Sequence, residues 1–148
     1  MIQRIQSVFL LAALGFMAPM FFVPTAEIFL ETGELLVFNF KGFYIDETLV
    51  SAQYSIMLFA ILICALNLIV LFMYKNRITQ MRLCIYNILL LIGITGIAFF
   101  TLYNVHGILT VSFRMPIVFP VISAIFHYLA FRGIRKDHFM VEALTRLR

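Results

Sequence analysis

The sequence predicts an all-α membrane protein, a four-transmembrane-helix antiparallel bundle that carries a small extracytoplasmic β-sheet and a cytoplasmic C-terminal helical tail. Of the 148 residues, 64% are hydrophobic and only 12% are charged, whereas a soluble domain has roughly 45–50% apolar and about 25% charged residues. The mean hydropathy is +1.05. A soluble chain of this length could not bury so much apolar surface in one core. We therefore expect residues 1–148 to form a single integral membrane domain.

Four apolar stretches without Asp, Glu, Lys or Arg have the length that a bilayer requires. A hydrocarbon core of roughly 30 Å needs about 20 helical residues. The predicted spans are residues 7–24, 54–74, 83–103 and 115–131. The first stretch also resembles a secretory signal peptide, but it is longer than the apolar region of such a peptide and contains Pro19 and Pro24. We expect a retained first helix with a kink at Pro19.

The basic residues predict the orientation of this bundle. Nine of the eleven Lys and Arg residues fall on one side of the predicted spans: Arg4, Lys75, Arg77, Arg82, Arg132, Arg135, Lys136, Arg146 and Arg148. Only Lys41 and Arg114 fall on the other side. Lys and Arg accumulate in cytoplasmic loops, so both termini are expected in the cytoplasm.

The outer segment, residues 25–50, is too long for a simple turn between the first two spans and is rich in strand-forming residues. Turn residues at "ETGE" and "KG" divide it into expected strands at residues 27–30, 34–40 and 43–46. The outer loop, residues 104–114, holds a fourth strand-like run at 108–113 that could pair with them. We expect three to four strands; the alternative is an irregular hydrophobic loop at the membrane interface.

His127 is the ionisable residue of most interest inside the predicted spans, because intramembrane polar groups mark function. It could relay a proton or bind a metal. However, no carboxylate lies at its depth, and His106 and His138 belong to opposite sides of the membrane, so a site with three or four ligands cannot form. The favoured interpretation is a neutral histidine bonded to a neighbouring helix.

Besides His127, three polar residues of the spans are expected to make interhelical contacts: Asn67, Asn87 and Thr95. Side-chain amides hydrogen-bond between helices and fix their register; a substrate-binding role is the alternative. Gly93 and Gly96 flank Thr95 and would let another helix approach closely. Their spacing is GxxG rather than the stronger GxxxG, so they predict packing only weakly.

The sequence contains no pattern typical of an enzyme. Cys64 and Cys84 are the only cysteines and form no CxxC motif; both are expected to be packing residues. No phosphate-binding loop, dinucleotide fingerprint or metalloprotease motif occurs. The acidic residues of the outer segment lack the spacing of a cation-binding loop. We therefore predict no catalytic, metal-binding or cofactor-binding residues.

The tail, residues 132–148, has the pattern of an amphipathic helix. Apolar residues recur at helical spacing: Met140, Val141, Leu144 and Leu147. Basic residues accompany them: Arg135, Lys136, Arg146 and Arg148. This pattern favours a helix that continues the last span and lies on the anionic inner leaflet. The same residues would also suit docking to a partner subunit.

Both ends of the chain resemble a bacterial four-span membrane-protein family catalogued as domain of unknown function 4293. The resemblance is carried by "MIQRIQ", which leads directly into the first span, and by "FP" (Phe119–Pro120), "LAFRGIRKD" and the final "RLR". At His138–Met140 the chain departs from the acidic residue and Leu-Val pair usual in that family. The resemblance implies a four-span layout in the bacterial inner membrane and brings no activity.

These observations lead to a non-enzymatic inner-membrane protein of unknown process, an accessory or scaffold subunit of a membrane complex. Its expected partners are the lipid bilayer and a protein of that complex, and nucleic acid is not expected. The alternative is a lipid- or quinone-binding protein, because 17 Phe and 8 Met residues suit an adaptable apolar cavity. A small transporter or channel is a third hypothesis and would need a continuous polar pathway.

Overall fold

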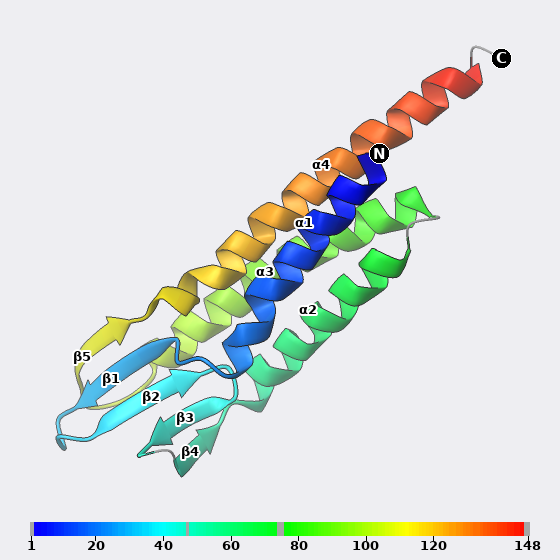
Figure 1. Ribbon diagram of the computed structural model, residues 1–148. Coiled ribbons are helices and arrows are strands. Elements are labelled where there is room, and N and C mark those ends of the chain that lie inside the picture. The colour runs from blue at the N-terminus through cyan, green and yellow to red at the C-terminus, as the bar shows by residue number, and fades with distance from the viewer. Residues whose placement is uncertain (1, 47, 74–75, 147–148) are drawn as a thin grey trace.

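The computed structural model describes residues 2–46, 48–73 and 76–146. Four α-helices dominate it: α1 (Ile2–Met17), α2 (Tyr54–Phe72), α3 (Arg77–Tyr103) and α4 (Phe119–Arg146). Short 3-10 helices follow α1 (η1, Ala18–Phe21) and precede α4 (η2, Met115–Val118). Successive helices run in opposite directions, so all strands gather at one end, the sheet end (Figure 1). The start of α1 and the end of α4 lie at the other end, here called the termini end.

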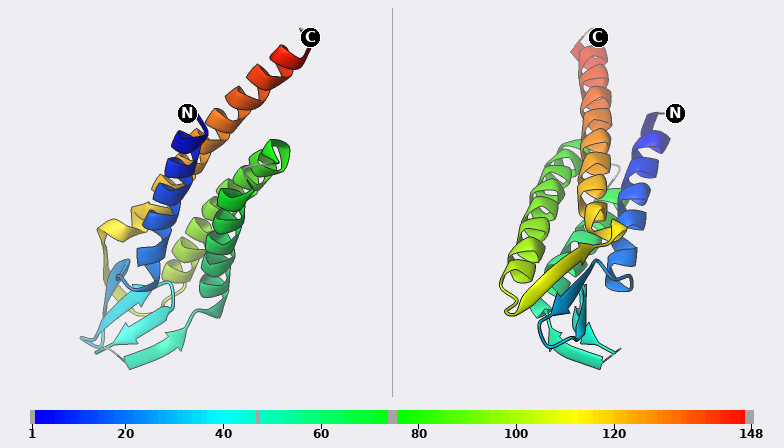
Figure 2. Two further views of the ribbon diagram at one scale, coloured as in Figure 1. Left: turned by 45° about the vertical axis from the view of Figure 1, so that its right-hand side comes forward. Right: turned by 90° about the vertical axis from the view of Figure 1, so that its left-hand side faces the viewer.

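The helices pack in a ring, in which α1 contacts α2 and α4, and α3 contacts the same two helices. Figure 2 shows α1 beside α4 and α2 beside α3. Aromatic side chains join α1 to α4: the ring of Phe16 stacks on Phe126 at 5.7 Å and meets the edge of Phe119 at 5.4 Å. Nearer the termini end, Gly133 of α4 lies close to Gln6 of α1. A Cβ added at Gly133 would lie 3.1 Å from the Cγ of Gln6.

Three helical segments of the described chain are long and apolar enough to cross a membrane: Tyr54–Phe72, Arg77–Tyr103 and Met115–Val141. The first predicted span is a shorter apolar helix, Ile5–Phe21. The expected kink at Pro19 takes the form of a change from α-helix to the 3-10 helix η1, whose first turn holds this proline; its missing N–H cannot serve the α-helical ladder. Tyr74, predicted to end the second span, lies outside the described residues, as does Lys75.

The prediction of a small sheet is confirmed, but the sheet has five strands and is entirely antiparallel. They are β1 (Ala26–Leu30), β2 (Leu35–Asn39), β3 (Gly42–Ile45), β4 (Thr48–Ala52) and β5 (Ile108–Phe113). The strand order is β4-β3-β2-β1-β5. Strands β1 to β4 form a meander between α1 and α2. Strand β5, from the loop between α3 and α4, pairs with β1 at the edge.

Strand β4 was not predicted from the sequence. The last strand expected in the outer segment ended at Asp46, and no strand was predicted after it. In the structure Asp46 has φ of +47°, a left-handed conformation that Asp adopts more readily than most residues. The chain therefore reverses at once, so that Thr48 pairs with Ile45 and its hydroxyl donates to the Ile45 carbonyl oxygen at 2.7 Å. Glu47 lies outside the described residues.

The buried residues form two apolar clusters along the bundle. The larger cluster joins the helix-facing side of the sheet to the helix ends beneath it; its members include Ile28, Phe38, Phe43, Met17, Met20, Ile56, Ile63, Leu91 and Ile94. The smaller cluster lies towards the termini end and consists of Leu10, Val70, Cys84, Ala130 and Ile134. The sheet and the helices thus share one core, and the sheet is not a separate domain.

Substitution of Gly42 tests how firmly the sheet belongs to this core. A Cβ at Gly42, which has φ of +157°, would overlap the backbone carbonyl oxygen of Ser51 on β4, so Gly42→Ala is expected to destabilise the protein by about 2 kcal/mol. A Cβ at Gly93 on α3 would meet nothing within 4 Å, so Gly93→Ala should be neutral or slightly stabilising. Thermal unfolding of both variants in detergent provides the comparison; equal midpoints would contradict this account.

Candidate functional site

A layer of polar side chains separates the two apolar clusters. Along α2 the buried residues run from Ile63 through Asn67 to Val70, so an amide interrupts an otherwise apolar row. Along α3 the same row runs through Asn87, and along α4 it runs through Ser123 and His127. All four side chains are buried, with at most 2% of each residue exposed. This polar layer (Asn67, Asn87, Ser123 and His127) is the main cluster of hydrogen-bonding groups inside the bundle.

The contact between Asn87 and His127 joins α3 to α4. The Asn87 Nδ2 atom lies 3.1 Å from His127 Nε2, and His127 Nδ1 lies 2.9 Å from the Ser123 carbonyl oxygen. Because an amide nitrogen can only donate, Nε2 accepts and the ring proton sits on Nδ1, which donates to Ser123. Both ring nitrogens of a neutral histidine are therefore used. The Asn87 Oδ1 atom has no hydrogen-bond partner among the described residues.

Helix α1 contributes backbone carbonyl oxygens to the same layer. The amide of Asn67 donates to the Leu10 carbonyl oxygen at 3.3 Å, and the Ser123 hydroxyl donates to that of Ala13 at 3.1 Å. Two turns nearer the termini end of α3 than Asn87, the buried amide of Gln80 donates to the Val70 carbonyl oxygen at 3.1 Å. The layer thus connects α1 to α2 and α4, and α3 to α4. Ser123 and Gln80 were not predicted as contact residues from the sequence.

Thr95 does not contribute the interhelical contact that its position predicted. Its hydroxyl donates to the Leu91 carbonyl oxygen at 2.7 Å, one turn back on the same helix, as threonine often does in a helix interior. The neighbouring Gly93 and Gly96 face open space, since a Cβ at either would meet nothing within 4 Å. The small-residue patch therefore packs against no other helix of this chain within the described residues.

The described residues offer little for chemistry at the layer. No group of three or more His, Cys, Asp or Glu residues among them could hold a metal ion. Cys84 is buried in the smaller apolar cluster and Cys64 packs beside the larger one, and both thiols are free. The prediction of a chain without catalytic, metal or cofactor residues is not tested by these observations and stays a prediction.

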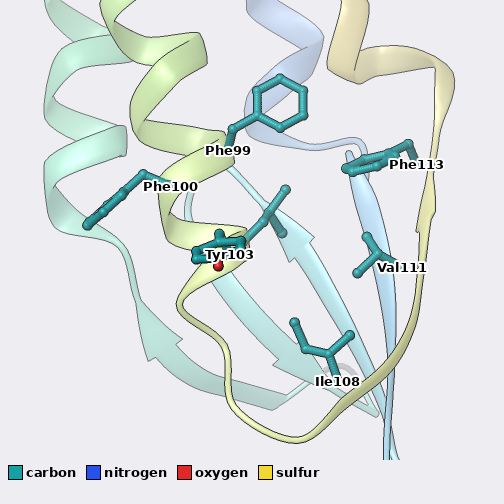
Figure 3. Close-up of a pocket in the computed structure, with 7 residues that line it drawn as sticks. Phe99, Phe100, Tyr103, Ile108, Val111 and Phe113 are labelled. Carbon is teal, nitrogen blue, oxygen red and sulfur yellow. The ribbon is translucent and has the colours of Figure 1, made fainter.

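An apolar groove lies at the sheet end, between the last turns of α3 and strand β5 (Figure 3). Its volume is about 580 Å³, and it is lined by Phe99, Phe100, Leu102, Tyr103, Ile108, Val111 and Phe113. Contact between the rings of Phe99 and Phe113, 5.9 Å apart, closes it on the side nearer the middle of the bundle. From there it extends along β5 past Tyr103 to Ile108. The Tyr103 hydroxyl is the single polar side-chain group of this lining.

At the termini end, α4 continues without interruption beyond the other three helices (Figures 1 and 2). Arg77 at the start of α3 supports it by an ion pair with Asp137, at 3.2 Å. Of the residues predicted to contact the membrane surface or a partner, Arg135 and Lys136 lie on this part of α4. Arg146 is its last residue, with a side chain that is not described, and Arg148 lies outside the described residues.

A comparison with protein families finds a match over residues 2–147 to the family described as "Domain of unknown function (DUF4293)". The match covers nearly the whole chain. The protein belongs to the DUF4293 family. This confirms the family that the two ends of the sequence predicted. A comparison with curated proteins gives no match.

Membership of DUF4293 carries no activity, so the site of this DUF4293 protein has to be judged from its geometry. The polar layer joins helices through hydrogen bonds of Asn67, Asn87, Ser123 and His127, which is the role expected for Asn67, Asn87 and His127. The groove and the free part of α4 lie at opposite ends of the molecule and have surfaces that the chain itself leaves uncovered. The free part of α4 belongs to the tail that was predicted to contact the membrane surface or a partner, whereas the groove was not predicted from the sequence.

A double-mutant cycle tests the Asn87–His127 contact. Asn87→Leu leaves His127 Nε2 buried without a donor and is expected to destabilise the protein by about 1 kcal/mol. Adding His127→Leu removes the unpaired group, so the double variant should be at least as stable as either single one. Thr95→Val, which removes a bond within one helix, serves as the control and should cost less. Additive effects at Asn87 and His127, measured by unfolding in mixed micelles, would contradict the proposed contact.

Proposed function

We propose that this protein is a non-enzymatic membrane protein that acts as an accessory or scaffold subunit of a membrane complex. The proposal includes a bacterial inner-membrane location, four spans and both termini in the cytoplasm, with α1 as the first span. The helical part of Ile5–Phe21 measures about 25 Å at 1.5 Å per residue, which the flanking residues can extend across a bilayer. Nine of the eleven basic residues then lie in the cytoplasm, as Lys and Arg normally do.

The observation that carries this proposal is the free end of α4. After Arg132 the helix carries basic residues, and yet Phe139 is 60% exposed and Met140 40% exposed. These exposed apolar residues lie on a helix that projects past its own bundle, and burial against another protein would remove them from water. The Arg77–Asp137 ion pair holds the base of this segment, so it is presented in one direction.

Two variants, each with one added cysteine, test the orientation. Glu34 in the outer segment and Ala143 near the end of α4 are both exposed. In intact bacterial cells a membrane-impermeant maleimide should label Glu34→Cys, whereas Ala143→Cys should react only after permeabilisation. The unsubstituted chain is the control, because Cys64 and Cys84 lie within the helices. Labelling of Ala143→Cys in intact cells would overturn the proposed orientation.

The scaffold role predicts a partner that is lost when the end of α4 is made polar. Phe139→Ser with Met140→Ser should remove a specific co-purifying membrane protein in gentle detergent, because the apolar contact is lost while the bundle is untouched. The matched control is Leu49→Ser with Val50→Ser on β4, where both side chains are also exposed. Quantitative mass spectrometry compares the two preparations. A protein that purifies alone in every form would contradict the scaffold proposal.

Lipid binding is the second candidate function, and the groove between α3 and β5 is the observation that favours it. Its volume of about 580 Å³ falls within the range of roughly 300–1,000 Å³ typical of small-molecule sites. Transport has less support, because the polar layer lies at a single level of the bundle and does not form a pathway along the helices.

A further inference from the structure

We propose that the groove between α3 and β5 binds one acyl chain of an outer-leaflet phospholipid. The proposal rests on the membrane orientation given above and is independent of the scaffold role, since the groove lies at the opposite end from the free part of α4. Its walls are the last turns of α3, with Phe99, Phe100 and Tyr103, and the helix-facing side chains of β5, with Val111 and Phe113.

The groove continues a surface that the bilayer already covers. Tyr86, Leu89, Phe100 and Tyr103 are all exposed along one side of α3, and this side leads directly into the groove at Phe100 and Tyr103. A lipid chain next to α3 therefore reaches the groove by lateral movement, without crossing water. Tyr103, which is 87% exposed, stands beside the opening, where an aromatic hydroxyl suits the boundary between hydrocarbon and headgroups.

The groove also extends beyond the helical span. Ile108 and Val111 come from a strand that follows the end of α3 at Tyr103, and Figure 3 shows Ile108 farther towards the sheet end than Tyr103. This part of the wall lies where water or headgroups would otherwise meet apolar side chains. An acyl chain drawn into the groove covers that apolar surface and removes it from water, which is favourable. A chain lying against the mid-membrane part of a helix has no such gain in free energy, because that part of the helix is already in lipid.

The chemistry of the lining favours an acyl chain over a peptide. No charged side chain lines the groove, and the Tyr103 hydroxyl is its single polar side-chain group. A peptide segment entering it would bury N–H and C=O groups opposite apolar side chains, which is costly without hydrogen bonds. An acyl chain has no such groups. The lining also lacks the paired donors that would hold the two carbonyl oxygens of a quinone ring.

Native mass spectrometry and photo-cross-linking together test this site. The full-length protein is reconstituted in vesicles of phosphatidylethanolamine and phosphatidylglycerol that contain a phosphatidylethanolamine with a diazirine in its acyl chain. We expect cross-links to concentrate on the groove residues, with fewer at Leu58, which is equally lipid-facing and 69% exposed. After mild delipidation we expect one phospholipid to be retained per chain.

Two tryptophan variants separate the groove from general lipid contact. Val111→Trp places a large side chain in the groove and should lower retention about tenfold, whereas Leu89→Trp, on the exposed side of α3 but outside the groove, should leave it unchanged. If Val111→Trp fails to fold, the cross-linking pattern of the unsubstituted protein still decides. Even labelling of the whole exposed surface, retention of a quinone, or a protein segment cross-linked in the groove would each overturn the proposal.

Discussion

The amide of Asn87 donates to His127 at the level where the two apolar clusters meet, and the bundle depends on this layer of hydrogen bonds. In a soluble protein, apolar burial would drive the helices together, but lipid chains are as apolar as the leucines and phenylalanines of this chain. Packing alone therefore does not fix how far one helix slides past the next. The hydrogen bonds to the carbonyl oxygens of Leu10 and Ala13 fix the position of α1 along its neighbours. The bond from Asn87 to His127 fixes the position of α3 along α4.

The sheet at the end of the bundle is a consequence of this register. Strand β1 directly follows α1 and η1, and strand β5 directly precedes η2 and α4. The two strands can pair over Ala26 and Phe113 only because α1 and α4 are adjacent and aligned. The pairing is reinforced where Arg114 contacts Glu27 by an ion pair and donates its backbone N–H to the Thr25 carbonyl oxygen at 3.0 Å. The long-range strand pairing therefore rests on the contact between two helices that are distant in the sequence.

Much of this architecture could be predicted from the residues, because apolar length and turn chemistry are local signals. The run at 108–113 was assigned from its composition, and the structure gives it the same bounds. Strand β4 was missed because the turn before it is made with Asp46 at positive φ, so that no glycine marks it. Ser123 was missed because one hydroxyl in an apolar span has no pattern of its own; its role depends on the carbonyl oxygen of Ala13, which is 110 residues away in the chain. The groove combines α3 with β5, and no window of sequence contains its shape.

The layer also links the two surfaces to which we assign binding. Phe99 in the groove lies twelve residues beyond Asn87 on α3, and Phe139 on the free end of α4 lies twelve residues beyond His127; each interval corresponds to about 18 Å along a helix. A helix transmits a shift at one point along its whole length, since its backbone bonds are internal. A change in the Asn87–His127 contact would therefore move α3 relative to α4 at both ends together. At the sheet end it would alter the width of the groove, because β5 joins these two helices. At the termini end it would alter the position of the projecting segment. The polar layer therefore sets the relative positions of the two surfaces at the ends of the bundle.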